Sequence, residues 1–312
     1  MRRLSDQFFS DLQTGYLSPL LGRVRQDNTL MLAIRNGYVN IYYRGGSLLK
    51  IEEKKAKYAV SFNHNYDTSL DKDRIRSLSM PDTILTTEDT YSLIGKIAQL
   101  KEIMDFHITA NPKEEREYQQ VVVRENNYSS ISNETEYFII DIEIADTSLS
   151  GRFDLSGIKW DARKRQHISQ CKPVFIEMKY GDSSLGGSAG MLKHLEDIEA
   201  FVIDRQNYEL YIKAMEEQFK QLDALNLIHF NHPNDVDLHL NPNDKPQFIF
   251  LLANHNPRAS KLKSILTAPD FQAKARSAPF ELLFSVTRFA GYSLHSKTML
   301  TLDQMIATLS EE

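Results

Sequence analysis

The chain has 312 residues, of which 41% are hydrophobic and 25% are charged, and its formal net charge is −5 at pH 7. This composition is that of a globular protein large enough for two hydrophobic cores, and it excludes a disordered chain. Without a basic excess, any nucleic-acid binding has to come from local clusters of lysine and arginine.

Two classes of protein are also disfavoured by the sequence. A single cysteine, Cys171, excludes internal disulfides and metal frameworks built on CxxC pairs. No apolar run approaches the roughly 18 residues that a membrane-spanning helix needs. The charged first residues have no apolar segment after them, so we read no signal peptide. We therefore expect a cytoplasmic protein with no membrane partner.

The first part of the chain predicts an antiparallel β-rich unit over residues 1–85. An apolar stripe predicts a short helix over 4–12, and the dipeptide Asn36-Gly37 between two strand-like runs is a strong hairpin signal. The polar stretch 67–82 leads out of this unit. The strands expected in it are 29–35, 38–44, 47–52 and 57–63.

Residues 86–312 predict a second unit of α/β class. Apolar spacing first predicts a helix over 87–105. A helix, three strands, a long helix and a buried strand then follow in order. Their expected ranges are 113–125, 134–145, 152–160, 174–179, 188–225 and 247–253. A short helix (258–266), a strand (280–289) and a helix after Thr301 complete the chain.

One group of polar residues lies in the second and third of these strands. Asp154 falls in the run GRFDLSGI (151–158), and Glu177 and Lys179 fall two apart in PVFIEMKYG (173–181). Strand side chains alternate between faces, so Glu177 and Lys179 point to the same side. If the two strands pair as neighbours, Asp154 lies beside them. Two carboxylates with an ammonium group predict a site for a hard cation suited to phosphodiester hydrolysis.

Asp154 followed by Glu177-Met178-Lys179 resembles the PD-(D/E)xK nuclease superfamily, most closely its RecB-type and Holliday-resolvase branches. The resemblance covers roughly residues 112–255 and extends to the order of helices and strands, although Phe153 replaces the proline of the literal motif. It implies a restriction-endonuclease-like core that hydrolyses phosphodiesters in DNA rather than RNA.

The resemblance also implies roles for particular residues. Asp154, Glu177 and the backbone carbonyl of Met178 would hold Mg²⁺ or Mn²⁺, and Lys179 would orient or deprotonate the attacking water. Many members add an acidic residue from the first helix, for which Glu117 is our choice. Asp141 and Glu143 are alternatives from the first strand, and an ordinary exposed helical glutamate is the plainer explanation of Glu117.

Residues that contact the nucleic-acid backbone are expected close to this motif. His194 stands where RecB-type nucleases carry a glutamine, and Ser188 lies in a Gly/Ser loop that we expect to cap the following helix. That loop lacks the Gly-Lys-Ser/Thr ending of a nucleotide triphosphatase. The remaining candidates are basic residues between the second and third strands, namely Lys159, Arg163, Lys164 and Arg165.

Other interpretations of these residues are compatible with the sequence. Glu177 and Lys179 could be an ordinary same-face salt bridge on a polar sheet surface. The chain would then be a catalytically silent module that binds nucleic acid or a protein partner. His229, His232 and His239 lie in an irregular polar tract whose spacing is loose for zinc. A homodimer, or a protein partner that supplies the grip on the substrate, is compatible with the low net charge.

Overall fold

The computed structural model describes residues 2–55, 57–69, 73–128, 135–144, 153–165, 171–231, 238–255, 260–287, 294 and 299–309. The chain divides into two compact units. The first comprises Met1–Gln120 and Glu217–Leu227, and the second comprises Val121–Glu216 and Ile228–Glu312. The first unit therefore extends beyond the predicted boundary at residue 85, because the helices that follow pack on its own strands and helices.

The first unit is built on a five-stranded antiparallel sheet in the order β1–β2–β3–β4–β5. The predicted four-strand meander is confirmed, and the Asn36-Gly37 turn joins β1 to β2 with Gly37 at φ 72°. The fifth strand is only two residues long and was not predicted. The bounds are Leu30–Ile34, Tyr38–Tyr43, Gly46–Lys54, Lys57–Ser61 and Thr83–Ile84.

Helices of the first unit surround this sheet. The single helix predicted over 87–105 is two helices, α4 and α5, because the chain breaks at Gly95-Lys96. Thr86 and Asp89 form a capping box that fixes the start of α4. The helices are α1 (Asp6–Gln13), α2 (Ser18–Gln26), α3 (Asp73–Ser77), α4 (Thr87–Ile94), α5 (Ile97–Ala110) and the first half of α6 (Glu114–Asn127).

The second unit is built on a mixed five-stranded sheet in the order β10–β9–β8–β7–β6. Strands β6, β7 and β8 are antiparallel neighbours, whereas β8, β9 and β10 run parallel. Every residue of β9 is buried, as its continuous apolar run predicts. The bounds are Tyr137–Ile144, Phe153–Trp160, Cys171–Tyr180, Gln247–Ala253 and Glu281–Thr287 for β6 to β10.

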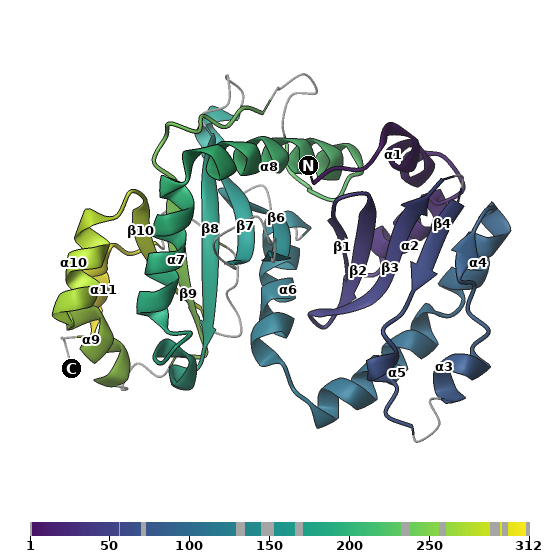
Figure 1. The fold of residues 1–312 in the computed structure, drawn as a ribbon, viewed down its shortest axis with the longest axis horizontal. Helices are drawn as coiled ribbons and strands as arrows, with labels where there is room; N and C mark the ends of the chain where they lie inside the picture. The colour runs from purple at the N-terminus through teal and green to yellow at the C-terminus, as the bar shows by residue number, and fades with distance from the viewer. Residues whose placement is uncertain are drawn as a thin grey trace. The chain divides into compact units, whose positions relative to one another are not determined.

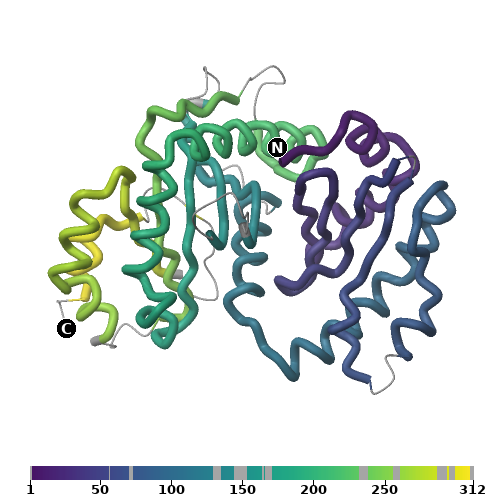
Figure 2. The backbone as a smooth tube through the Cα atoms, viewed as in Figure 1, coloured from purple at the N-terminus to yellow at the C-terminus, as the bar shows by residue number. Residues whose placement is uncertain are grey.

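Two helices, α7 (Met191–Ile203) and α8 (Arg205–Ala224), replace the one predicted over 188–225. The chain turns between them, as Figure 2 shows, and Asp204 is the one residue that separates the two helices. The Asp204 carboxylate accepts hydrogen bonds from the backbone N–H and side-chain amide of Asn207. Phe175 of β8 contacts the rings of Phe201 and Tyr211, so both helices cover the same face of the sheet.

The remaining helices gather beside β10 (Figure 1). They are α9 (Ser260–Thr267), α10 (Pro269–Ser277) and α11 (Leu302–Thr308), of which α10 was not predicted. The order α6, β6, β7, β8, α7, α8, β9 agrees with the predicted order of helix, three strands, helix and strand, apart from the break in the long helix. Within the described ranges, no helix is long and apolar enough to cross a membrane.

Candidate active site

The pairing of β7 with β8 places Asp154 opposite Glu177. The register joins Leu155 to Ile176 and Ser156 to Phe175, and its continuation by one residue brings Asp154 opposite Glu177. Residues opposite each other in an antiparallel pair point to the same side, with Cβ atoms roughly 4.5–5.5 Å apart. This is the neighbouring arrangement that the strand pattern predicts.

A backbone hydrogen bond fixes the Asp154 side chain in this position. Its Oδ2 accepts from the N–H of Met178, at 2.8 Å, on the neighbouring strand. The carboxylate therefore lies against β8 between the positions of Glu177 and Lys179, although Asp154 itself remains partly exposed.

Glu177 and Lys179 form a buried ion pair on the same face. Lys179 Nζ donates to Glu177 Oε1 at 2.8 Å, and the two side chains are only 5% and 4% exposed. Nζ also donates to the carbonyl oxygen of Ala189, at 3.1 Å, in the loop before α7. Burying two charges is costly unless other hydrogen bonds compensate them, and the Ala189 carbonyl supplies one such bond.

His194 adds a third group to this cluster. Its Nε2 lies 2.9 Å from Glu177 Oε1 and 3.1 Å from the Ala189 carbonyl oxygen. Since both neighbours accept hydrogen bonds, Nε2 carries the ring proton. Its Nδ1 is buried and has no hydrogen-bond partner in the described part of the chain. His194 therefore holds the Glu177 carboxylate from the first turns of α7.

The carboxylate oxygens of Asp154 and Glu177 suit a hard divalent cation that keeps part of its water shell. Lys179 and His194 both use Oε1 of Glu177, while Oε2 accepts no hydrogen bond from any residue that the structure describes. Mg²⁺ requires only one or two protein carboxylates, with waters completing its coordination. In the same ranges no group of three or more His, Cys, Asp or Glu side chains is arranged to hold a metal.

Glu117 lies in the first unit, whereas Asp154 lies in the second. Arg44 Nε and Nη2 donate to the two carboxylate oxygens of Glu117 at 2.9 and 3.1 Å, and Arg44 Nη1 donates to Asp105 at 2.9 Å. The hydrogen bonds to Glu117 are the largest of the effects that raise the pKa of Arg44. Glu117 thus takes part in a forked ion pair with this arginine.

The two alternative acids of the first strand differ in position. Asp141 is fully buried, and its Oδ1 accepts from the N–H of Ile142 at 2.8 Å. Glu143 lies opposite Asp154, since the register joins Ile142 to Leu155 and Ile144 to Phe153. Its φ of 50° is unusual for a residue with a side chain. Of the two, Glu143 is therefore the acid next to Asp154.

The predicted basic contacts fall into different environments. Arg163 is exposed and Lys159 is half-buried, whereas the side chain of Lys164 lies outside the described residues. Arg165 is only 4% exposed, and its guanidinium lies over the rings of Phe138 and Phe230. It also donates to the backbone carbonyl of Thr135. This burial argues against a phosphate contact by Arg165.

The Gly/Ser loop does not cap α7 as predicted. Helix α7 begins at Met191 after Gly190, with no side-chain cap, and Ser188 is exposed outside it. The loop contributes instead through the Ala189 carbonyl, which sequence reasoning missed because a backbone atom leaves no compositional signal. The Gly181–Gly190 segment thus supplies a fixed acceptor for Lys179 and His194.

Two other histidines, His239 and His255, each lie close to a carboxylate. His239 Nδ1 lies 3.1 Å from Glu216 Oε1, whereas His232 falls outside the described residues. A pair that was not predicted joins His255 to Asp182 at 2.8 Å beyond the ends of β9 and β8. The two residues are 73 positions apart in the sequence, so no local motif could indicate that contact.

Comparisons of this chain with protein-family models, with curated proteins and with solved structures find no match. Its function has to be argued from the chemistry of the site.

Proposed function

We propose that the chain is a metal-dependent nuclease that hydrolyses phosphodiester bonds in DNA, and that its second unit is a restriction-endonuclease-like core of the PD-(D/E)xK type. The observation that carries the proposal is the position of Asp154 opposite Glu177, with the Lys179 ammonium group 2.8 Å from the Glu177 carboxylate. An ordinary surface salt bridge would not require the burial of both partners or a second carboxylate beside them.

Asp154, Glu177 and the Met178 carbonyl would hold Mg²⁺ or Mn²⁺. When bound, such a cation lowers the pKa of a coordinated water and offsets charge on the phosphate. Lys179 has three ammonium protons, of which Glu177 and Ala189 take two. The third is available to orient the attacking water or to stabilise a phosphate oxygen. His194 keeps the Glu177 carboxylate in place while this happens.

Cleavage of labelled single- and double-stranded DNA in Mg²⁺, Mn²⁺ or EDTA tests the proposal. The variants are Asp154→Asn and Lys179→Met, with Asp161→Asn and Lys172→Met as controls that remove the same charges from positions outside the candidate site. We expect metal-dependent cutting that falls by about 10²-fold or more in the first two variants. The two controls should retain cutting.

The burial of Glu177 and Lys179 is also compatible with the second candidate, a catalytically silent module that binds nucleic acid or a protein partner. Binding of DNA without cutting in any of the metals, unchanged by Asp154→Asn and Lys179→Met, would favour that module and overturn the nuclease. The product lengths from an active enzyme would separate internal cutting from cutting at ends. Light scattering with and without DNA would address a homodimer.

A further inference from the structure

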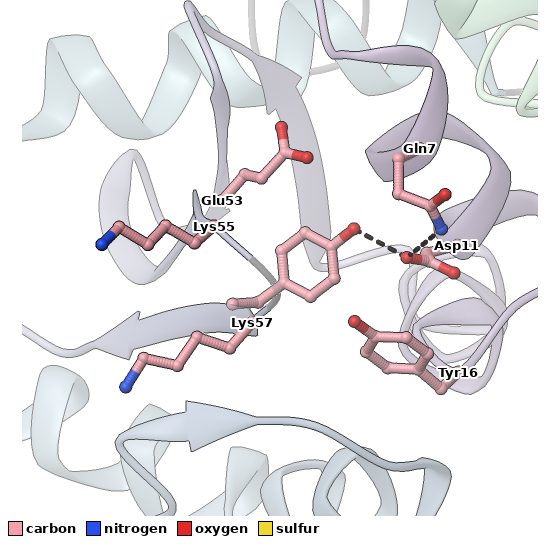
Figure 3. A pocket seen from close by; sticks show the side chains of 7 residues that line it. Gln7, Asp11, Tyr16, Glu53, Lys55 and Lys57 are labelled. Carbon is pink, nitrogen blue, oxygen red and sulfur yellow. Dashed lines mark hydrogen bonds between the residues drawn. The ribbon is translucent and has the colours of Figure 1, made fainter.

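A cavity of about 270 Å³ lies within the first unit, between α1 and the β3–β4 hairpin (Figure 3). This volume lies just below the range of about 300–1,000 Å³ that is typical of small-molecule sites, so the cavity can hold at most one small ligand. The side chains that line it come from α1, the following loop and the hairpin, and they are Gln7, Asp11, Tyr16, Glu53, Lys55, Lys57 and Tyr58.

One end of the cavity is built around a buried carboxylate. Asp11 is 7% exposed, and its Oδ2 accepts from the Tyr58 hydroxyl at 2.8 Å and from the Gln7 side-chain amide at 3.0 Å. Gly15 closes the other side, since a Cβ there would lie 2.3 Å from Asp11 Oδ1. Burial, followed by the hydrogen bond to Asp11, raises the pKa of Tyr58, which keeps its phenol neutral.

The same end offers hydrogen-bond acceptors to a ligand. Ser5 donates to Glu53 Oε1 at 2.9 Å, while Glu53 Oε2 accepts no hydrogen bond from the described residues. Because the Gln7 amide nitrogen is engaged with Asp11, Gln7 has only its carbonyl oxygen and one N–H left for a ligand. In Figure 3, Glu53 lies on one side, and Gln7 and Asp11 lie on the other. This arrangement favours a ligand group that donates hydrogen bonds.

The other end is cationic. Lys55 and Lys57 are exposed and form no ion pair within the described chain, whereas the neighbouring Lys54 lies 2.8 Å from Glu52. Their side chains extend away from Asp11 in Figure 3. The rings of Tyr16 and Tyr58, with centroids 5.6 Å apart, form an aromatic wall. The cavity is therefore lined by acceptors at one end, by lysine side chains at the other and by two aromatic rings inclined at 54° to each other.

We propose that this cavity binds a single nucleotide whose base carries an exocyclic amino group. Carboxylate and amide oxygens accept from the amino groups of cytosine and adenine. Tyrosine rings offer a surface for a base, and lysines neutralise a phosphate.

Two ligands would carry these groups: a free nucleotide, and a nucleotide that is unstacked from a nucleic-acid strand. The second ligand would give the first unit a role in the proposed nuclease, as a reader of one base in the substrate. Nucleotide binding itself does not depend on cleavage, so the two proposals can fail independently.

Isothermal titration of the full chain carrying Asp154→Asn tests the site without cleavage. The probes are AMP, CMP, UMP and ribose 5-phosphate, followed by an adenine- or cytosine-rich oligonucleotide. We expect AMP or CMP to bind about tenfold more tightly than UMP and ribose 5-phosphate. Tighter binding of the oligonucleotide than of its mononucleotide would identify a strand as the source, and the reverse would identify the free nucleotide.

Three further substitutions, in the same background, locate the binding. Tyr16→Ala and Lys57→Ala each remove a lining group without removing the buried Asp11 or Tyr58, and each should weaken AMP or CMP binding by about tenfold. Lys54→Ala removes the same charge from the same turn and should leave binding unchanged. Equal binding of ribose 5-phosphate, no binding of any nucleotide, or an equal effect of Lys54→Ala would overturn the proposal.

Discussion

The Glu177 carboxylate is held by two neighbouring side chains. Lys179 and His194 both contact its Oε1, and Lys179 and His194 share the Ala189 carbonyl as a second acceptor. Asp154, in contrast, is fixed by the backbone of the neighbouring strand. The chemistry of the site and the stability of the second unit therefore depend on the same charges.

Removing the charge of Glu177 alone should destabilise the protein. In Glu177→Gln the Lys179 ammonium remains buried without a counter-charge, which costs about 3–5 kcal/mol of unfolding free energy. The double variant Glu177→Gln, Lys179→Met removes both charges and should recover most of that loss. Urea denaturation at pH 7 measures both effects, and a loss below about 1 kcal/mol in the single variant would contradict the expectation.

Asp27, at the end of α2, should make stability depend on pH. Burial raises the pKa of this carboxyl, but hydrogen bonds from Lys101 and Thr29 outweigh that effect, and the net pKa falls below its ordinary value of 3.8. A lowered folded-state pKa stabilises the protein above the ordinary value, and this contribution is lost as the pH falls through the folded-state pKa.

The comparison of wild type with Asp27→Asn checks this sign. We expect the substitution to cost about 1–3 kcal/mol at pH 7, where the charged partner Lys101 loses its counter-charge. The difference in urea midpoint between the two proteins should shrink as the pH is lowered below about 4. A difference that stayed constant down to pH 3 would show that packing, not charge, is lost.

At the scale of the elements, the turn between β2 and β3 requires a glycine for two separate reasons. Gly45 has φ 71°, and a Cβ there would lie 2.4 Å from the backbone carbonyl of Arg116. Gly37 has nearly the same dihedral, φ 72°, but open space around its missing side chain. The two positions therefore separate backbone strain from steric exclusion.

Alanine at these two glycines gives a matched comparison. Gly37→Ala should cost about 1–2 kcal/mol, which is the cost of a left-handed conformation alone. Gly45→Ala should cost more, because the start of α6 has to move away from the turn. Chemical denaturation measures both values. Equal losses would mean that α6 shifts freely, and the steric argument would then be wrong.

Strong periodicity made most elements predictable. The Asn36-Gly37 hairpin, the alternation around Asp154 and Glu177, and the unbroken apolar run of β9 each reflect a local physical rule. The breaks at Gly95 and Asp204 were missed because the apolar spacing continues across them. The charged side chains of the site were predicted from the sequence. The Ala189 carbonyl and the pairing of Glu117 with Arg44 were not predicted, because both depend on tertiary contacts.

At the scale of the whole molecule, the first unit is assembled from two separated parts of the chain. Gln218 donates to the carbonyl of Ile34 at 3.0 Å, and Gln221 exchanges two hydrogen bonds with the backbone of Leu4. Residues 217–227 also bring apolar side chains that are fully or almost fully buried, namely Phe219, Leu222 and Leu225. This short segment is therefore part of the core of the first unit.

A linked fragment tests that dependence. Residues 1–120 joined through a Gly/Ser linker to residues 217–227 should be more stable than residues 1–120 alone by about 2 kcal/mol or more, because the added segment covers apolar surface. Urea denaturation of the two fragments measures the difference. No gain from the added segment would indicate that the first 120 residues complete their own core.

The division of the first unit has a consequence for the order of events during translation. Residues 217–227 are made only after roughly 100 further residues have followed Gln120. At about 5–20 residues per second, that interval lasts roughly 5–20 s. Throughout it, the nascent sheet β1–β5 lacks the segment that covers part of its apolar surface. The core of the first unit thus cannot be completed until the middle of the second unit has been synthesised.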